Sequence, residues 1–306
     1  MKLNFKVALL IPTLNAGKEW LNTLDSIRSQ TIEIRTKIII DSGSSDDTVP
    51  LARQYGFDVV EIKKAEFNHG KTRQQAADLS NDADICVFLT QDAILASPES
   101  IKNIVDAFED PEVGMAYGRQ LPHQNAKPLE THARLFNYPD EPVINSIADA
   151  DKLGFKITFC SNSFAAYRYS ALMKVGGFPT DSIMGEDAIV AAKMIQAGYK
   201  KAYVANAAVY HSHSYTVSEE FKRYFDTRVF HEQNKWIIDT YGKPTGAGIK
   251  FMVSELQYVL KHDPKSIVKS ISSLGAKWLG YKSGGFYKKM SRSLLKKLSM
   301  HHFYWK

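Results

Sequence analysis

The sequence predicts an α/β fold with a mostly parallel central sheet flanked by helices, followed by a helical C-terminal extension. Through residue 117, short apolar runs alternate with segments of helical spacing, and strands joined by helical crossovers pair in parallel. From Thr216 onward the spacing is mostly helical, with proline and glycine as punctuation. A chain of 306 residues with 44% hydrophobic content can form one large domain and a smaller appendage.

The first half contains strands that we place at residues 6–11, 37–40, 58–62, 84–90 and 113–117. The helix after the first strand carries Trp20, Leu24 and Ile27 at helical spacing. The next helix follows the turn-forming residues 41–48, and a third starts near Lys71. Polar loops follow these strands, and in such sheets the ligand site lies at the carboxyl ends of the strands. We therefore expect the loops to meet at one edge.

The second half is less regular. Residues 118–155 contain four prolines, which predicts an irregular excursion beside the ligand site. Apolar spacing then predicts a strand over 157–167, a helix over 186–197 and a strand over 201–210. The last of these strands delivers His211 to its end.

The net charge of +6 is unevenly distributed. Ten lysines and arginines and no acidic residue follow Asp263, so the basic character belongs almost wholly to the C-terminal tail. Around Tyr287, Met290, Leu294 and Leu298 the tail has helical apolar spacing, which predicts an anionic membrane surface as its partner. The alternative is a terminal helix packed on the main domain. Nucleic acid is not an expected partner, because the chain offers no motif for reading it.

Cysteine content and hydropathy bear on location. The two cysteines, Cys86 and Cys160, lie among residues typical of strands and form neither a disulfide framework nor a CxxC metal site, which favours a reducing cytoplasm. The apolar stretch near the start is interrupted by Pro12, and no other apolar run approaches membrane-spanning length. We expect a cytoplasmic protein, peripheral at the inner face of the cell membrane.

Four separated motifs together resemble a known family. They are Ile11-Pro12-Thr13-Leu14-Asn15, the 41–48 segment, Thr90-Gln91-Asp92-Ala93 and Gly185-Glu186-Asp187. Their order and approximate spacing resemble family 2 glycosyltransferases with the GT-A fold, over roughly residues 5–240. Residues 67–73, and His211-Ser212-His213 ahead of residues 221–225, look most like bacterial rhamnosyltransferases.

The resemblance implies a domain plan and a reaction. Residues 1–215 would form the GT-A catalytic domain, with a nucleotide-sugar half at 1–117 and an acceptor half at 118–215. Residues 216–306 would form a helical region with the basic aromatic tail. The implied reaction is inverting, metal-dependent transfer of L-rhamnose from dTDP-rhamnose to a cell-envelope polysaccharide such as O-antigen, or to a lipid-linked glycan.

The resemblance assigns a nucleotide-sugar site, for which we take Pro12, Thr13, Asn15, Asp41, Gly43, Ser44, His69, Gly70, Arg73 and Gln91. Asp41 would accept a hydrogen bond from the imide N–H of uracil or thymine, and Arg73 would make paired contacts with phosphate oxygens. Each stretch has a plainer interpretation. Residues 12–15 suit a helix-start turn, Asp41 an N-cap, and residues 69–73 the start of a surface helix.

The implied metal ligands are Asp92, His211 and His213, which would bind Mg²⁺ or Mn²⁺. The family usually has Asp-x-Asp where this chain has Thr90-Gln91-Asp92, so the first acidic group is missing. Imidazole ligands lean slightly toward Mn²⁺. A histidine at such a position can also serve only packing.

Asp187 is the implied general base, because a sugar hydroxyl attacks well only as its proton leaves. Glu186 would orient the acceptor or the base. Both residues could instead simply favour the dipole in the first turn of a helix.

Other functions stay open at this point. One is a glycosyltransferase with a UDP-sugar donor. A nucleotidyltransferase would need a glycine-rich basic loop after the first strand, and Asn15-Ala16-Gly17-Lys18 is a poor version of one. A non-catalytic nucleotide-binding or membrane-binding module is a third. The helices after Thr216 could also form a homodimer interface.

Overall fold

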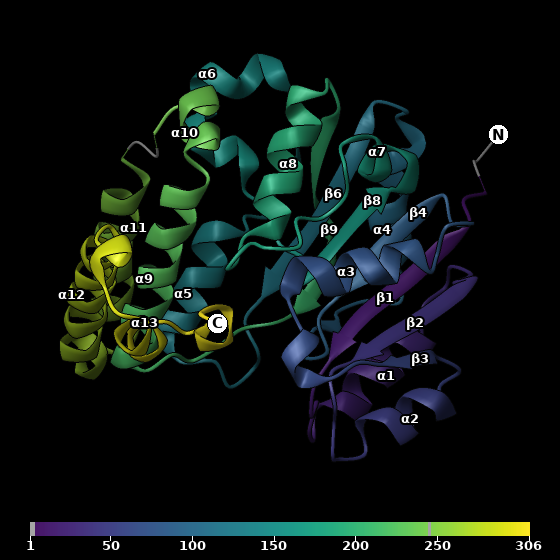
Figure 1. Cartoon of the computed structure of the whole chain (residues 1–306), viewed down its shortest axis with the longest axis horizontal. Coiled ribbons are helices and arrows are strands. Elements are labelled where there is room, and N and C mark those ends of the chain that lie inside the picture. Colours follow the sequence, from purple (N-terminus) through teal and green to yellow (C-terminus); the bar gives the residue numbers. More distant parts are fainter. Residues whose placement is uncertain (1–3, 244–245) are drawn as a thin grey trace.

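The computed structural model describes residues 4–243 and 246–306, and the whole sheet is continuous (Figure 1). Nine strands form it in the order β3-β2-β1-β4-β8-β6-β9-β5, and β7 pairs with β9. The strands are β1 Val7–Thr13, β2 Thr36–Asp41, β3 Asp58–Glu61, β4 Ile85–Leu89, β5 Ile94–Leu95, β6 Val113–Leu121, β7 Val143–Asn145, β8 Phe164–Arg168 and β9 Lys200–Tyr210.

The sheet is mixed. It is parallel through β3, β2, β1 and β4, and again where β6 meets β9. Strand β8 runs antiparallel to both of its neighbours, and β5 and β7 pair antiparallel with β9. The α/β class is confirmed, and its parallel part is the part where the sequence alternates strands with helices.

Helices cover both faces of the sheet and form a separate layer at its side. They are α1 Trp20–Arg28, α2 Thr48–Gln54, α3 His69–Asp78, α4 Ser100–Asp106, α5 Pro128–Asn137, α6 Ala150–Leu153, α7 Tyr169–Lys174, α8 Glu186–Gln196, α9 Val217–Gln233, α10 Lys235–Tyr241, α11 Ala247–His262, α12 Ile267–Gly284 and α13 Arg292–Leu298. Figure 1 shows α9 to α13 gathered on the left, beside the sheet-bearing part. The helical C-terminal region is thereby confirmed.

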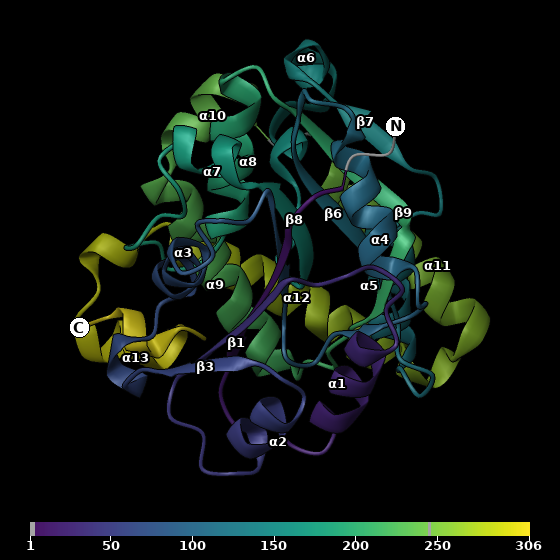
Figure 2. The same ribbon diagram turned by 90° about the vertical axis from the view of Figure 1, so that its right-hand side faces the viewer.

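Burial of β1 on both faces explains its unbroken apolar run. Leu9 and Ile11 pack in a core with Trp20, whereas Leu10 packs on the other face with Ala76. Figure 2 shows α1 and α3 on opposite sides of β1. A strand covered by helices on both faces has no reason to alternate apolar with polar residues.

Two predictions for the second half are wrong. Residues 118–155 are not an irregular excursion, because they hold the end of β6, then α5, β7 and α6. Pro128 is at the start of α5, where its missing N–H costs no hydrogen bond. Nor do residues 157–167 form one strand. A 3₁₀ turn occupies Gly154–Thr158 and β8 begins only at Phe164, so Cys160 lies in a loop.

The C-terminal tail packs on the main domain, which is the alternative that the sequence left open. The single helix predicted around residues 287–298 is broken, because Met290 is extended and the Ser291 side chain caps a new helix by accepting from the backbone N–H of Leu294. Leu295 is buried in a core formed with α9 and α10, and Trp305 packs against the same core. Within the described ranges, no helix combines the length and apolarity needed to cross a bilayer.

Candidate active site

Three side chains predicted as metal ligands lie together. Asp92 follows β4, and His211 and His213 follow β9. One potential ligand atom from each lies within 4.8 Å of the other two. The Nε2 atom of His211 lies 3.5 Å from Oδ1 of Asp92, and Nε2 of His213 lies 3.5 Å from Oδ2 of the same carboxylate. The two Nε2 atoms are 3.1 Å apart.

Gln120 of β6 orients the first of these imidazoles. Its Oε1 lies 3.0 Å from Nδ1 of His211, and an amide oxygen can only accept, so Nδ1 carries the proton. The lone pair of the neutral ring is then on Nε2, facing Asp92. Metal-binding histidines are commonly held by such a hydrogen bond on the other ring nitrogen.

The donor set fits a divalent cation. A carboxylate and two imidazoles bring lone pairs to one point, and that point needs a positive charge to balance them. His211 is buried, whereas the side chains of Asp92 and His213 are 40% and 38% exposed. The cluster therefore has a protein side and an open side, on which water or phosphate oxygens could complete a coordination shell.

Asp187 and Glu186 form the first turn of α8, after Gly185 in the left-handed conformation. A side chain at Gly185 would also meet the Phe230 ring, with its Cβ only 2.8 Å away. The Asp187 carboxylate accepts from the backbone N–H of Ala188 at 2.8 Å and of Asn162 at 3.2 Å. Burial, with the negative charge of Glu186, raises the pKa of Asp187 to about 7.

Glu186 is held differently from its neighbour. Its Oε1 lies 3.0 Å from Nη1 of Arg73, and it accepts from Nδ2 of Asn162 at 3.0 Å. Burial is the largest influence and disfavours its ionised form, but the charges of Arg73 and His69 and the hydrogen bond from Asn162 together lower the pKa of Glu186. Two adjacent carboxyl groups thus have pKa values shifted in opposite directions, a pattern found in acid–base sites.

The predicted phosphate-binding stretch at the start of α3 is closely packed. Arg73 is buried against Glu186, and burial lowers the pKa of His69. The His69 ring packs edge-on against that of His301, 5.2 Å away. A side chain at Gly70 would have its Cβ 1.8 Å from the Pro179 carbonyl oxygen, so this glycine is required by close packing of α3.

The loop before β8 connects the metal cluster to Asp187. Ser161 accepts from Nε2 of Gln120 at 2.8 Å, and the Ser163 carbonyl accepts from the backbone N–H of Thr90 at 3.2 Å. Asn162 lies between them and bonds to both acids of α8. Sequence reasoning missed Gln120, Ser161 and Asn162. The polar residues 161–163, directly before the buried strand β8, were the signal in the sequence that could have indicated Ser161 and Asn162.

The predicted nucleotide site lies at the ends of β1, β2 and β4. Asp41 is buried, and its carboxylate accepts from the hydroxyl groups of Thr13 and Ser44 and from the N–H groups of Gly43 and Ser44. Pro12 lies within β1, paired with β2. The loops at these strand ends therefore meet, as expected.

Two further side chains tie these loops together. The Asn15 side chain accepts from the backbone N–H of Ser45, and Asn15 itself has a positive φ of 44°. Gln91 accepts from the N–H of Leu14 at 2.8 Å and donates to its carbonyl at 3.1 Å. The position next to Asp92 thus holds the loop after β1 in place.

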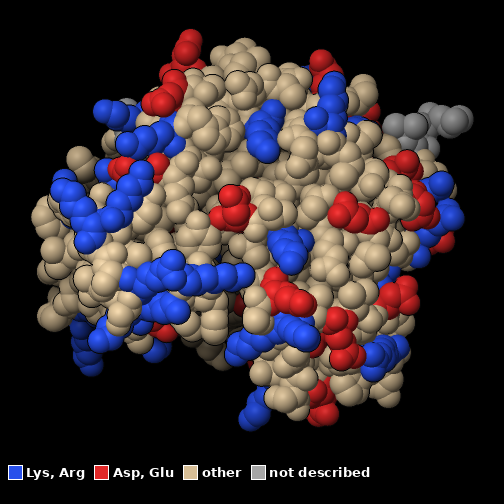
Figure 3. Space-filling model, in the orientation of Figure 1, with Lys and Arg blue, Asp and Glu red and all other residues tan. Residues whose placement is uncertain are grey.

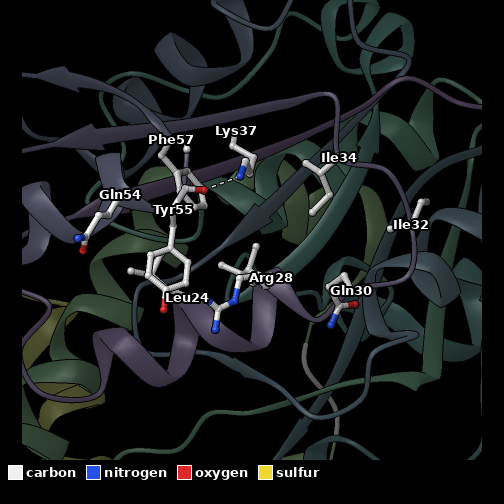
Figure 4. Close-up of a pocket in the computed structure, with 11 residues that line it drawn as sticks. Leu24, Arg28, Gln30, Ile32, Ile34, Lys37, Gln54, Tyr55 and Phe57 are labelled. Atoms are coloured by element: carbon white, nitrogen blue, oxygen red, sulfur yellow. Dashed lines mark hydrogen bonds between the residues drawn. The ribbon is translucent and has the colours of Figure 1, made fainter.

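A separate hollow of about 740 Å³ lies between α1 and the segment from α2 to β3 (Figure 4). Its lining includes Arg28, Ile34 and Phe57, and Lys37 donates to the Tyr55 carbonyl at its wall. None of the predicted site residues lines it. We do not assign it to the site.

Comparison with known proteins agrees with the fold and the motifs. The pattern of glycosyl transferase family 2 matches residues 8–176. The chain is 50% identical to the O-antigen chain rhamnosyltransferase RfbN of Salmonella typhimurium, over 98% of this chain and 96% of that protein. It is 46% identical to the O-antigen chain rhamnosyltransferase WbaN of Salmonella anatum, over 97% and 95% of the two chains.

Solved structures show the same architecture. The mannosyltransferase PcManGT of Pyrobaculum calidifontis, in complex with GDP-Man and Mn²⁺, matches with a TM-score of 0.60 and 18% identity, over 99% of this chain and 86% of that one. Glucosyl-3-phosphoglycerate synthase of Mycobacterium tuberculosis, with Mn²⁺ and UDP, matches with a TM-score of 0.53 and 16% identity, over 79% and 82%. The GT-A fold is confirmed. The chain belongs to glycosyl transferase family 2 and is a glycosyltransferase.

Proposed function

We propose that this protein transfers L-rhamnose from dTDP-rhamnose to a growing O-antigen or a related lipid-linked cell-envelope glycan, with inversion and with a divalent metal. The observation that carries the proposal is the cluster of Asp92, His211 and His213, connected through the loop before β8 to Asp187. The sugar and the acceptor are supported by the names of two relatives that match over nearly their whole length.

The nucleotide would bind over the strand ends that carry Thr13, Asn15 and Asp41. Both oxygens of Asp41 already accept internal hydrogen bonds, so in this proposal it holds Gly43 and Ser44 in position beside the base. Each of these oxygens accepts two such bonds, which uses the four lone-pair sites of the carboxylate, so an imide N–H would bond to Asp41 only by replacing one of them, such as the bond from the Ser44 hydroxyl.

The diphosphate would lie at the open side of the metal cluster. Asp92, His211 and His213 would hold Mg²⁺ or Mn²⁺, and Gln91 keeps the facing loop in place. The bound cation would balance the charge that develops on the nucleoside diphosphate as it departs. Arg73 contributes in this scheme by neutralising Glu186, its partner at 3.0 Å.

Asp187 would accept the proton of the attacking acceptor hydroxyl. A general base works best when its pKa is near the working pH, and burial places the pKa of Asp187 at about 7. Asn162 and Ala188 fix the carboxylate by donating backbone N–H groups to it. The hydroxyl then attacks the anomeric carbon from the side opposite the leaving diphosphate, which inverts that centre in one step.

A donor screen tests this function. Purified protein is incubated with dTDP-rhamnose, UDP-glucose, UDP-N-acetylglucosamine or GDP-mannose, with Mn²⁺, Mg²⁺ or a chelator, and release of nucleoside diphosphate is measured. We expect turnover of dTDP-rhamnose, its loss in chelator, and an α-linked product from the β-linked donor by NMR. Preference for a UDP-sugar would show that dTDP-rhamnose is not the donor. Full activity in chelator would show that the reaction needs no divalent metal.

A second arm separates other classes of protein. Incubation with a nucleoside triphosphate and a sugar 1-phosphate would give pyrophosphate if the protein were a nucleotidyltransferase, and we expect none. A non-catalytic binding module would bind donor without turning it over. Asp187→Asn is the matched control in both arms, because it keeps the size of the side chain and removes its basicity.

A further inference from the structure

The outward side of α12 is an apolar stripe. Ile271 follows Val268 by three residues, and Trp278 and Leu279 follow Ile271 by seven and eight, about two turns, which places the four side chains on one side of the helix. All four are exposed, Val268 at 71%, Trp278 at 62% and Leu279 at 52%. A tryptophan and three branched aliphatic side chains in one exposed line are unusual on a protein surface, where exposed apolar residues are normally scattered.

The opposite side of α12 fixes this orientation. A Cβ at Gly280 would lie 2.2 Å from the Phe221 carbonyl oxygen, and one at Gly284 would lie 2.5 Å from that of Phe225. These glycines let α12 lie directly against α9, so the helix cannot turn its apolar stripe inward without losing that contact. The stripe is exposed because the packing of α12 leaves it outside.

Helix α11 adds a second exposed apolar line. It precedes α12 through the short turn Pro264–Ser266, and the two helices contact each other. Its exposed apolar side chains are Ile249, Met252, Val253 and Leu260. In Figure 1 the two helices form the left-hand edge of the molecule, on the far side of the C-terminal layer from the sheet. We call residues 247–284 the α11–α12 hairpin.

The hairpin surface is basic. Its exposed charged side chains are those of Lys250, Lys261, Lys265 and Lys282. The acid of α11, Glu255, is buried, where it accepts from Ser270 and lies 3.4 Å from Lys277. Figure 3 shows lysine and arginine side chains gathered over this left-hand part of the molecule.

We propose that the α11–α12 hairpin docks on an anionic lipid bilayer, with its two apolar stripes in the headgroup region and its lysines on the acidic lipid headgroups. Apolar surface combined with lysines matches such a bilayer on both counts, because the acyl boundary accepts Trp278 and its neighbours while the headgroups attract the lysines. A second copy of the chain fits less well, because two-fold pairing through this surface would bring its lysines face to face.

This proposal relocates the membrane contact that the sequence predicted. The apolar residues of the last helix and the C-terminal end are used inside the protein, since Leu295 is buried and Trp305 packs on the same core. The side chains left outside are those of the hairpin, earlier in the chain. The proposal does not depend on the identity of the sugar donor.

Flotation with lipid vesicles tests it, using the full-length protein. We expect the wild type to bind vesicles of phosphatidylcholine with 30% phosphatidylglycerol at least tenfold more strongly than pure phosphatidylcholine, and less strongly as salt is raised. The double substitution Trp278→Gln with Leu279→Gln should lower binding at least tenfold. The same should hold for Lys265→Gln with Lys282→Gln on anionic vesicles only.

Leu79→Gln is the matched control. Leu79 is 49% exposed, a fraction similar to that of Leu279, but it lies after α3 on the main domain. It should leave vesicle binding unchanged. All variants should keep the wild-type melting curve and turnover of soluble donor, so loss of folding or of the active site is detected separately. Equal vesicle binding by the Trp278→Gln, Leu279→Gln protein would overturn the proposal. The proposal would also be overturned if light scattering showed that the wild type is a dimer and that the same double variant is a monomer.

Discussion

At the scale of single residues, the site depends on two neighbouring acids whose environments differ. Glu186 is paired with Arg73, whereas Asp187 is partly buried beside that charge and receives only backbone N–H groups. Asn162 contacts both acids, and Tyr167 in turn donates to Asn162 at 2.7 Å. The contrast between the two carboxyl groups is therefore built by a few buried polar contacts.

This contrast predicts a pH profile. Only ionised Asp187 can take a proton, so kcat/KM for donor and acceptor should fall as pH decreases through about 7. Asp187→Asn should lower kcat by about 10²-fold or more and abolish this acid limb. Initial rates measured from pH 5 to 9 check both. If the Asp187→Asn protein kept the same acid limb in its pH–rate profile, a group other than Asp187 would be responsible for it.

Stability should respond to the same group. Because burial raises the folded pKa of Asp187 from its usual 3.8 to about 7, folding favours its protonated form. Its contribution is present at low pH and is lost as pH rises through that interval. We therefore expect the melting temperature of Asp187→Asn, relative to wild type, to increase between pH 5 and pH 8. If the difference in melting temperature between the two proteins stayed constant with pH, the pKa of Asp187 would not be raised by folding.

Gln120 gives a second prediction at this scale. It touches no predicted substrate atom, but its Oε1 fixes the His211 ring, so Gln120→Ala should weaken Mn²⁺ binding by about 10- to 100-fold. Titration followed by electron paramagnetic resonance measures this without turnover. Gln54→Ala is the matched control, because Gln54 is exposed at the end of α2, and it should bind Mn²⁺ as wild type does. If the Gln120→Ala protein bound Mn²⁺ as tightly as the wild type, Gln120 would not position the His211 ring.

At the scale of elements, the C-terminal segment (residues 299–306) is tied to α9. Buried Asp226 accepts from the backbone N–H groups of Met300 and His301, at 2.9 and 3.0 Å. This places the His301 ring against His69, at the start of α3 beside Arg73. A segment that the sequence assigned to a membrane surface thus lies against the element that holds Glu186.

Breaking this attachment should affect both folding and turnover. Asp226→Ala leaves two N–H groups without their acceptor, so we expect the free energy of unfolding to fall by about 1 to 3 kcal/mol in urea titrations. Deletion of residues 299–306 should lower both stability and donor turnover. Phe303→Gln, at an exposed position in the segment, should change neither. Wild-type turnover by the truncated protein would show that the segment does not support the site.

At the scale of the whole molecule, the sheet brings together groups that are far apart in the sequence. His211 meets Asp92 because β9 and β4 end at the same side of the sheet, although other strands lie between them. The helices after β9 form a layer beside the sheet, with one side packed on α8 and the other exposing the α11–α12 hairpin. The protein thus has its catalytic groups in the sheet-bearing part and its exposed apolar stripes at the far edge of the helical layer.

The sequence by itself determined the α/β alternation and the loops at the strand ends, whereas Asp92, His211 and His213 became candidate metal ligands through the family resemblance, and the structure brings them together. Apolar periodicity and turn residues act over a few positions, so they can be recognised without the rest of the chain. Its errors fall where local pattern is ambiguous, as at Pro128, which starts a helix, and at residues 159–163, which precede a strand.

Only the tertiary structure decided which partners the polar groups have. Gln120 reaches His211 across 91 positions, and Asp226 holds the His301 N–H across 75. Arg73, expected to face phosphate, pairs instead with Glu186 far along the chain. A buried polar group bonds to whichever partner the packing brings within reach, and the residues that surround it in the sequence do not specify that partner.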